Sequence, residues 1–276
     1  MSRRARCAAA SSRVWNTLRR SRDDAFPSVL ARSWGRLALG FAFLASLAAS
    51  DAGAQNRPGV DVALVLAVDV SGSINAEEFK LQKEGIALAL LDPAVQRAIR
   101  NGPHGRIAVA YVEWGSPGGA APVLEWRIVR DEASAREVGA ALLAAPRTAQ
   151  SYNAIGDAIV LRTAMIRACP CRAGRAVIDV SGDNRDMRSV IPATLAREEA
   201  ARAGITVNAL AILQDASVGP SGKPFLVEAY EREVIGGPGA FVAVAESRTD
   251  FGRAIRRKMA LEISGVSAPV RVGAVP

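Results

Sequence analysis

Residues 60–73 read VDVALVLAVDVSGS and join a nearly continuous apolar run to an oxygen-rich loop. The unbroken apolar run from Val60 to Val68 is typical of a strand that is buried on both faces of a parallel sheet. The loop that follows places Asp69, Ser71 and Ser73 at alternate positions. Because alternate residues of extended backbone point the same way, one carboxylate and two hydroxyls are expected to converge at the end of this strand.

Strand and helix patterns alternate along the rest of the chain. Further strands are expected at residues 106–114, 124–129, 176–180, 205–213 and 240–245. Helices are expected from the Asn75 cap to Asp92, from Pro93 to near Gly102, and at residues 133–144, 154–168, 192–203, 223–234 and 250–263. This order predicts an α/β fold: a three-layer, doubly wound, mostly parallel central sheet with helices on both faces.

Residues 1–54 are predicted to be a leader that contains a signal peptide. Residues 37–49 read LALGFAFLASLAA, thirteen uncharged residues that follow Arg32 and Arg36. A membrane span needs roughly 20 apolar residues, so this run matches the apolar region of a signal peptide, with cleavage expected after Ala54. We therefore expect an exported protein, without a stable membrane span after cleavage. The charged stretch that precedes the apolar run has two explanations, a downstream start codon or a genuinely long leader.

The net charge of +8 belongs mostly to this leader. Residues 1–54 hold nine arginines and three acidic residues, so the remaining 26 basic and 24 acidic residues leave a net charge of only +2. Nucleic-acid binding depends on clustered basic side chains that neutralise phosphates. The distribution of charge therefore argues against a nucleic-acid partner for the mature part.

A second oxygen-rich loop, Ser181-Gly182-Asp183-Asn184, follows the strand expected at residues 176–180. Sites in open α/β sheets form at the carboxyl ends of the strands. Carboxylate and hydroxyl oxygens suit Mg²⁺, which keeps several of its waters when protein binds it. The alternative is that Asp69 and Ser73 only cap the following helix.

Seven segments in order, AVDVSGSI, YVEWG, NAIGDAI, VIDVSGD, AGITVNALAI, VIGGPGAF and AIRRKMALEI, resemble von Willebrand A domains. They resemble an uncharacterised branch of that superfamily found in secreted proteins of Gram-negative bacteria. Together with the predicted signal peptide, this resemblance implies a periplasmic or secreted protein of a Gram-negative bacterium. The resemblance covers nearly the whole mature chain and implies one domain over residues 58–264, followed by a short tail at 265–276.

The resemblance implies a metal-ion-dependent adhesion site that holds Mg²⁺ or Mn²⁺. Its first loop corresponds to Asp69, Ser71 and Ser73. Asn153 stands where the family has a threonine, with Ser151 as the alternative, and Asp183 corresponds to the third-loop aspartate, with Asp179 as the alternative. Asn184 replaces the glycine that usually follows this aspartate.

The function expected from these features is that of a secreted binding module, not an enzyme. The partner would be a protein that supplies an acidic residue to the cation. Two other functions remain open: a metal-free von Willebrand A-like scaffold for periplasmic assembly, and a metal-assisted hydrolase. The hydrolase lacks an evident general base, since the single histidine, His104, lies in a loop expected to face solvent.

Other polar residues are assigned no catalytic role. Glu113 is expected either to be buried and hydrogen-bonded or to face the cleft, and Asp157 lies in the first turn of a helix. Cys169 and Cys171 could form a bridge or remain thiols, and they are interpreted as an exposed turn. The basic residues from Arg253 to Lys258 are interpreted as a solvated helix face.

Overall fold

The computed structural model describes residues 57–118, 122–214 and 217–265. The predicted leader, including its apolar region at residues 37–49 and the cleavage position after Ala54, lies outside the described residues, as does the tail from residue 266. Within the described residues, no helix is both long and apolar enough to cross a membrane.

Six strands form one sheet in the order β3-β2-β1-β4-β5-β6. The bounds of the strands are β1 (Gly59–Asp69), β2 (Ile107–Trp114), β3 (Pro122–Val129), β4 (Arg172–Gly182), β5 (Ile205–Ile212) and β6 (Val242–Ala245). Only the edge strand β3 pairs antiparallel. The predicted mostly parallel sheet is confirmed, and β1 lies between β2 and β4, as its apolar sequence requires.

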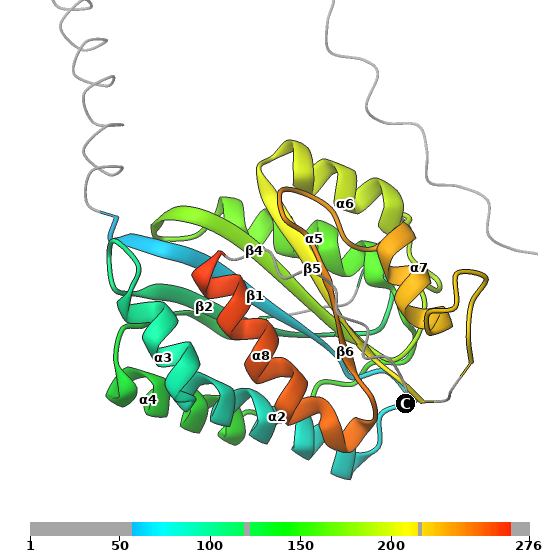
Figure 1. Ribbon diagram of the computed structural model, residues 1–276, viewed down its shortest axis with the longest axis horizontal. Helices are drawn as coiled ribbons and strands as arrows, with labels where there is room; N and C mark the ends of the chain where they lie inside the picture. The colour runs from blue at the N-terminus through cyan, green and yellow to red at the C-terminus, as the bar shows by residue number, and fades with distance from the viewer. Residues whose placement is uncertain (1–56, 119–121, 215–216, 266–276) are drawn as a thin grey trace, which may run out of the picture. The chain divides into compact units, whose positions relative to one another are not determined.

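Helices cover both faces of this sheet (Figure 1). One layer contains α2 (Ala76–Leu91), α3 (Pro93–Arg100), α4 (Glu132–Ala144) and α8 (Phe251–Ser264), which pack on one another and on the larger core cluster. The other layer contains α5 (Ile155–Arg167), α6 (Ala193–Arg202) and α7 (Phe225–Glu233). Along β1, Leu66 and Val68 enter the first layer's core and Ala67 enters the second, because successive side chains point to opposite faces.

The first helix begins at the predicted cap. Asn75 Oδ1 accepts a hydrogen bond from Glu78 N at 3.0 Å, and Glu78 Oε2 accepts one from Asn75 N at 2.9 Å. This reciprocal pair satisfies two of the N–H groups that a helix start leaves without partners. The helix therefore caps itself with Asn75 and Glu78, and it does not use the side chains of Asp69 and Ser73 for that purpose.

Lys258 contradicts the expected solvated face of α8. Its side chain is fully buried, and its Nζ lies 2.7 Å from Asp179 Oδ2 on β4 and 2.5 Å from Glu262 Oε1. Residue 258 follows Ile255 by three positions, so it lies on the stripe of α8 that packs against the sheet. The burial is tolerated because the side chains of Asp179 and Glu262 and the ring of Phe241 surround the ammonium group.

The cysteine pair also differs from the exposed turn that we expected. Cys169 and Cys171 form a disulfide, and both side chains are buried. They pack against Val60, Ala63 and Ala108 where the sheet meets the end of α5. The sequence left two chemical states open, a disulfide or two free thiols, and the structure contains the disulfide.

Candidate functional site

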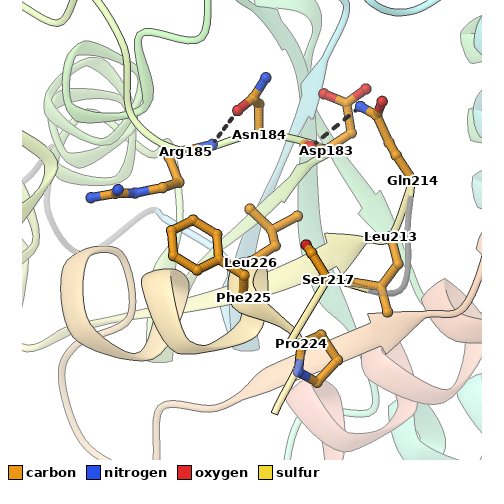
Figure 2. A pocket seen from close by; sticks show the side chains of 9 residues that line it. All are labelled: Asp183, Asn184, Arg185, Leu213, Gln214, Ser217, Pro224, Phe225 and Leu226. Atoms are coloured by element: carbon orange, nitrogen blue, oxygen red, sulfur yellow. Dashed lines mark hydrogen bonds between the residues drawn. The ribbon is translucent and has the colours of Figure 1, made fainter. Parts of the chain in front are cut away.

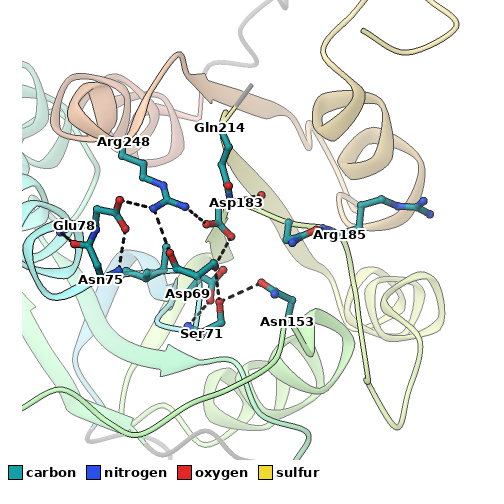
Figure 3. A network of polar contacts seen from close by, with 12 residues as sticks. Asp69, Ser71, Asn75, Glu78, Asn153, Asp183, Arg185, Gln214 and Arg248 are labelled. Carbon is teal, nitrogen blue, oxygen red and sulfur yellow. Dashed lines mark hydrogen bonds and ion pairs between the residues drawn. The ribbon is translucent and has the colours of Figure 1, made fainter. Parts of the chain in front are cut away.

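Two loops carry the candidate site, and both follow neighbouring parallel strands. Val68 pairs with Ser181 in the β1–β4 ladder, so Asp69 and Asp183 emerge at the same edge of the sheet. Asp183 and Asn184 begin the loop after β4 (Figure 2). The loop after β1 carries Ser71 (Figure 3), and Ser73 follows it two residues later. Adjacent carboxyl ends are where open α/β sheets place their sites.

The first loop folds back on its own carboxylate. Asp69 Oδ1 accepts a hydrogen bond from Ser71 N at 2.8 Å, and Ser71 Oγ lies 3.0 Å from Ser73 Oγ. Arg147 holds the loop from outside, since its Nη2 donates to the carbonyl oxygens of Val70, Ser71 and Ile74 at 2.9, 3.2 and 2.7 Å. The side chains of Asp69 and Ser71 are buried, whereas Ser73 is exposed at the mouth of the site.

The second loop brings Asn153, and not Ser151, toward the first. Asn153 is buried, and its Oδ1 lies 3.5 Å from Ser71 Oγ. Its backbone is fixed because Met187 N donates to its carbonyl oxygen at 2.7 Å. Ser151 is exposed and interacts through its backbone: its N–H donates to Ser116 Oγ, and its carbonyl oxygen accepts from Gly72 N.

The third loop contributes Asp183, whose side chain is fully buried. Its Oδ1 accepts a hydrogen bond from Ser73 Oγ at 3.1 Å, which ties the first and third loops together. Asp179, the alternative residue, lies inside β4, where it pairs with Lys258 of α8 and accepts from Ser181 Oγ at 3.2 Å. The structure therefore gathers Asp183, and not Asp179, with the residues of the first loop.

Two buried carboxylates share this site. Burial, and then the nearby charge of Asp183, raises the pKa of Asp69 to about 7, well above its ordinary value of 3.8. The Oδ2 atom of Asp69 is buried and has no hydrogen-bond partner within the described part of the chain. A buried carboxylate oxygen that lacks a donor and lies near a second carboxylate calls for a proton or a cation.

Sequence reasoning missed Arg248, which reaches the site from the 3₁₀ turn η1 (Arg248–Asp250). Its Nη2 lies 2.9 Å from Asp183 Oδ2, its Nη1 donates to Ser73 O at 3.2 Å, and it also forms an ion pair with Glu78. Nothing in the local sequence signals this contact, because Arg248 is 175 positions from Ser73.

Glu113 and Asp157 support the loops and do not enter the site. Glu113 is buried, and its Oε2 accepts from Thr148 N at 2.6 Å, which anchors the start of the second loop. Asp157 accepts from the N–H groups of Gly118, Val190 and Ile191, each at 3.0 Å. The carboxylate of Asp157 therefore fixes two neighbouring connections at the edge of the sheet.

The side-chain atoms at this site that could bind a cation are all oxygens. Five side chains meet here: Asp69, Ser71, Ser73, Asn153 and Asp183. Within the described residues, no group of three or more histidine, cysteine, aspartate or glutamate side chains is placed to hold a metal ion by itself. A cation here would thus depend on hydroxyl and amide oxygens in addition to two carboxylates, a combination that suits Mg²⁺ or Mn²⁺ better than softer metals. The residues present fit such an ion.

Solved von Willebrand A domains share this architecture. Proximal thread matrix protein 1 from the mussel byssus, whose structure is described as having a zinc-occupied MIDAS motif, matches with a TM-score of 0.51 and 13% identity over 74% of this chain and 46% of that one. The pilus adhesin SpaC from Lactobacillus rhamnosus GG matches with a TM-score of 0.52 and 16% identity over 76% and 31%. A von Willebrand factor type A protein from Catenulispora acidiphila matches with a TM-score of 0.50 and 15% identity over 74% and 43%.

These matches establish the fold that the sequence resemblance implied. The chain spans less than half the length of each of these three solved proteins. Among proteins of curated function, none matches this sequence. One family model, described as protein of unknown function (DUF1194), matches residues 59–267, and it shows that this chain, with its von Willebrand A fold, belongs to the DUF1194 family.

Proposed function

We propose that this protein is an exported binding module that engages a protein partner through a divalent cation. The cation would be held by Asp69, Ser71, Ser73, Asn153 and Asp183. The observation that carries this proposal is the buried Oδ2 atom of Asp69, which has no hydrogen-bond partner among the described residues and belongs to a site that also holds a second carboxylate and the hydroxyls of Ser71 and Ser73. A bound Mg²⁺ or Mn²⁺ would supply an open coordination position for an acidic side chain of the partner.

Each residue has a distinct part in this proposal. Asp69 supplies negative charge from the floor of the site, and Ser71 and Ser73 supply neutral oxygens above it. Asn153 offers a carbonyl oxygen in place of the hydroxyl that the family usually has. Because few of these donors are charged, a carboxylate from outside gains more from joining the cation than it would at a site already saturated with carboxylates.

Export to the periplasm or the cell exterior is part of the proposal. The predicted signal peptide supports it, and so does the Cys169–Cys171 bridge, because disulfides persist in oxidising compartments and are rare in the cytosol. SpaC, a pilus adhesin, gives one example of a protein with this fold in an adhesive role.

We infer that the protein is not an enzyme. His104 lies next to Gly59 and donates its backbone N–H to Asp61 at the start of β1, whereas the site lies at the end of that strand. Glu113, a buried carboxylate of β2, is enclosed and accepts a hydrogen bond from the backbone N–H of Thr148. A hydrolase would need a base within hydrogen-bond reach of a water at the site. A metal-free scaffold is the stronger rival, because Arg248 already supplies one positive charge to Asp183.

The proposal is tested by capture of partners on the immobilised full chain. We expect proteins from a periplasmic and extracellular extract to be retained in MgCl₂, released by EDTA, and not retained by Asp69→Asn. Equal retention in EDTA, and by Asp69→Asn, would favour the metal-free scaffold instead. Turnover of a generic phosphoester that requires Mg²⁺ and is lost in Asp69→Asn would favour the hydrolase.

A further inference from the structure

A small cavity of about 200 Å³ adjoins the proposed cation site. Asp183 belongs to both: its carboxylate faces Ser73 and Arg248, and the residue also lines the cavity. The cavity lies between the loop after β4, the end of β5 and the start of α7 (Figure 2). Asp183 is therefore common to the proposed cation site and to the cavity.

The far wall of the cavity is apolar and contains an exposed aromatic ring. Leu213, Phe225 and Leu226 supply this wall, and Phe225 is 42% exposed. The guanidinium of Arg185 lies over the ring, 5.6 Å from its centroid, and forms an ion pair with Glu233 at 2.5 Å. The ring is thereby held in place at an opening to solvent, although burying it would be favourable.

The size of the cavity indicates what it can accept. Pockets for small-molecule ligands usually measure about 300–1,000 Å³. A cavity of about 200 Å³ is smaller than this range and leaves room for one aliphatic or aromatic side chain. A peptide side chain is therefore a better fit than a free metabolite.

The charges around the two openings favour an acidic segment. The side chains of Arg185 and Arg248 are 43% and 25% exposed, whereas those of their partners Glu233 and Asp183 are 16% and 0% exposed. Positive groups therefore face solvent while the carboxylates are covered. Such a surface attracts a negatively charged partner and opposes a basic one.

We propose that this cavity is a specificity pocket for the residue next to the partner's cation-bound carboxylate. The partner is an extended protein segment that carries Asp or Glu beside a leucine, isoleucine, methionine or phenylalanine. Consecutive Cα atoms are only about 3.8 Å apart, and Asp183 belongs to both the proposed cation site and the cavity, so the residue next to a cation-bound carboxylate would lie near the cavity. This inference rests on the proposed cation site, because the cation fixes the position of the carboxylate.

The test uses fluorescent hexapeptides and the full chain in MgCl₂. The probes are GGDLGG, GGLDGG, the acid-only peptide GGDGGG and the acid-free peptide GGNLGG. We expect one of the two leucine-containing acidic peptides to bind about tenfold more tightly than GGDGGG, because burial of a leucine side chain supplies that much affinity. GGNLGG should bind at least tenfold more weakly than the better acidic peptide.

Two variants connect the effect to the cavity. Phe225→Ala should remove the advantage of leucine over glycine, while Mg²⁺ binding, measured by calorimetry, stays unchanged. The matched control is Leu195→Ala, which truncates a 56% exposed apolar side chain on α6 and should leave that advantage intact. Circular dichroism of both variants confirms that they are folded.

The outcomes separate the pocket from the cation site. If the chain binds Mg²⁺ but all acidic peptides bind equally, or none binds, the pocket is refuted and the cation site stands. If the preference for leucine survives both EDTA and Asp69→Asn, the cavity selects leucine without a cation, and both the cation-dependent function and the proposed link between pocket and cation are refuted. A preference for leucine that Phe225→Ala does not change also overturns the pocket.

Discussion

Arg248 Nη2 lies 2.9 Å from Asp183 Oδ2, although the two residues are 65 positions apart in the chain. The same guanidinium contacts Ser73 O and Glu78, so the arginine closes one side of the candidate cation site (Figure 3). It places a tethered positive charge on a carboxylate that a divalent cation would also use. The arginine and the cation therefore compete electrostatically for Asp183.

From this competition we expect Arg248→Gln to bind Mg²⁺ about tenfold more tightly than the unaltered chain. Removal of one nearby positive charge makes the free energy of Mg²⁺ binding more favourable by about 1 kcal/mol or more. Isothermal titration calorimetry at low ionic strength measures the change. Arg253→Gln is the control, since the exposed Arg253 of α8 pairs with Asp250 of η1. Unchanged or weaker Mg²⁺ binding by Arg248→Gln would mean that the arginine supports the site instead of opposing the cation.

The second loop gives a direct comparison between its two candidate ligands. We expect Asn153→Ala to weaken Mg²⁺ binding about tenfold, a loss of about 1.4 kcal/mol, because the amide oxygen of Asn153 lies near Ser71 Oγ. Asn153→Thr, which restores a hydroxyl, should stay within about threefold of the unaltered chain. Ser151→Ala should have no effect, because Ser151 interacts through its backbone. The reverse order, with loss only in Ser151→Ala, would assign the ligand to Ser151.

Glu262 should make the stability of the fold depend on pH. Burial, and then the charge of Asp179, raises the pKa of Glu262 to about 8, from an ordinary value of 4.5. Between these two values the folded protein holds a proton that the unfolded chain releases, so the free energy of unfolding falls as pH rises. The contribution of one group is at most about 1.4 kcal/mol per pH unit.

Urea unfolding at pH 5, 6, 7 and 8 tests this prediction. Glu262→Gln keeps a carbonyl oxygen for Asn208 and Lys258 but removes the titrating proton. The free energy of unfolding should therefore fall less steeply with rising pH in this variant. Glu125→Gln, at an exposed position of β3, should leave the decline unchanged. An equally steep decline in Glu262→Gln would show that other groups cause it.

Gly156 permits close contact between the start of α5 and the segment before α6. A Cβ atom at this position would lie 1.8 Å from Ile191 O, a backbone atom that cannot rotate away. We expect Gly156→Ala to lower the free energy of unfolding by about 3 kcal/mol. Gly252→Ala in α8, where the nearest atom is Gly85 Cα at 3.7 Å, should be neutral or stabilising. Thermal unfolding of both variants measures the difference, and equal stability would contradict the predicted clash.

Local patterns were sufficient to predict the architecture. The apolar run of β1, the Asn75–Glu78 cap and the regular alternation of strands and helices are encoded within a few residues of each other. Element ends were less accurate: β4 extends over Arg172–Gly182, whereas the sequence indicated residues 176–180. The added residues at its start are largely exposed and lack the apolar signal of a buried strand.

The polar contacts between distant segments could not be predicted in this way. Arg248 meets Asp183 only because η1 follows β6 and folds over the loop after β4. Lys258 is a different case, since its spacing of three from Ile255 places it on the buried stripe of α8. Its charge suggested exposure, but Asp179 pairs with that charge inside the core, and Glu262 accepts a hydrogen bond from the ammonium group. Helical periodicity was the better guide there than residue type.

Mg²⁺ titration of the purified full chain by calorimetry tests the central claim most directly, with Asp69→Asn titrated in parallel. Asp69→Asn is close in shape to the native residue but lacks the charge at the floor of the site. We expect saturable binding of one Mg²⁺ per unaltered chain and no measurable binding by Asp69→Asn. Absence of binding to both proteins, or equal binding by both, would contradict a cation site at Asp69.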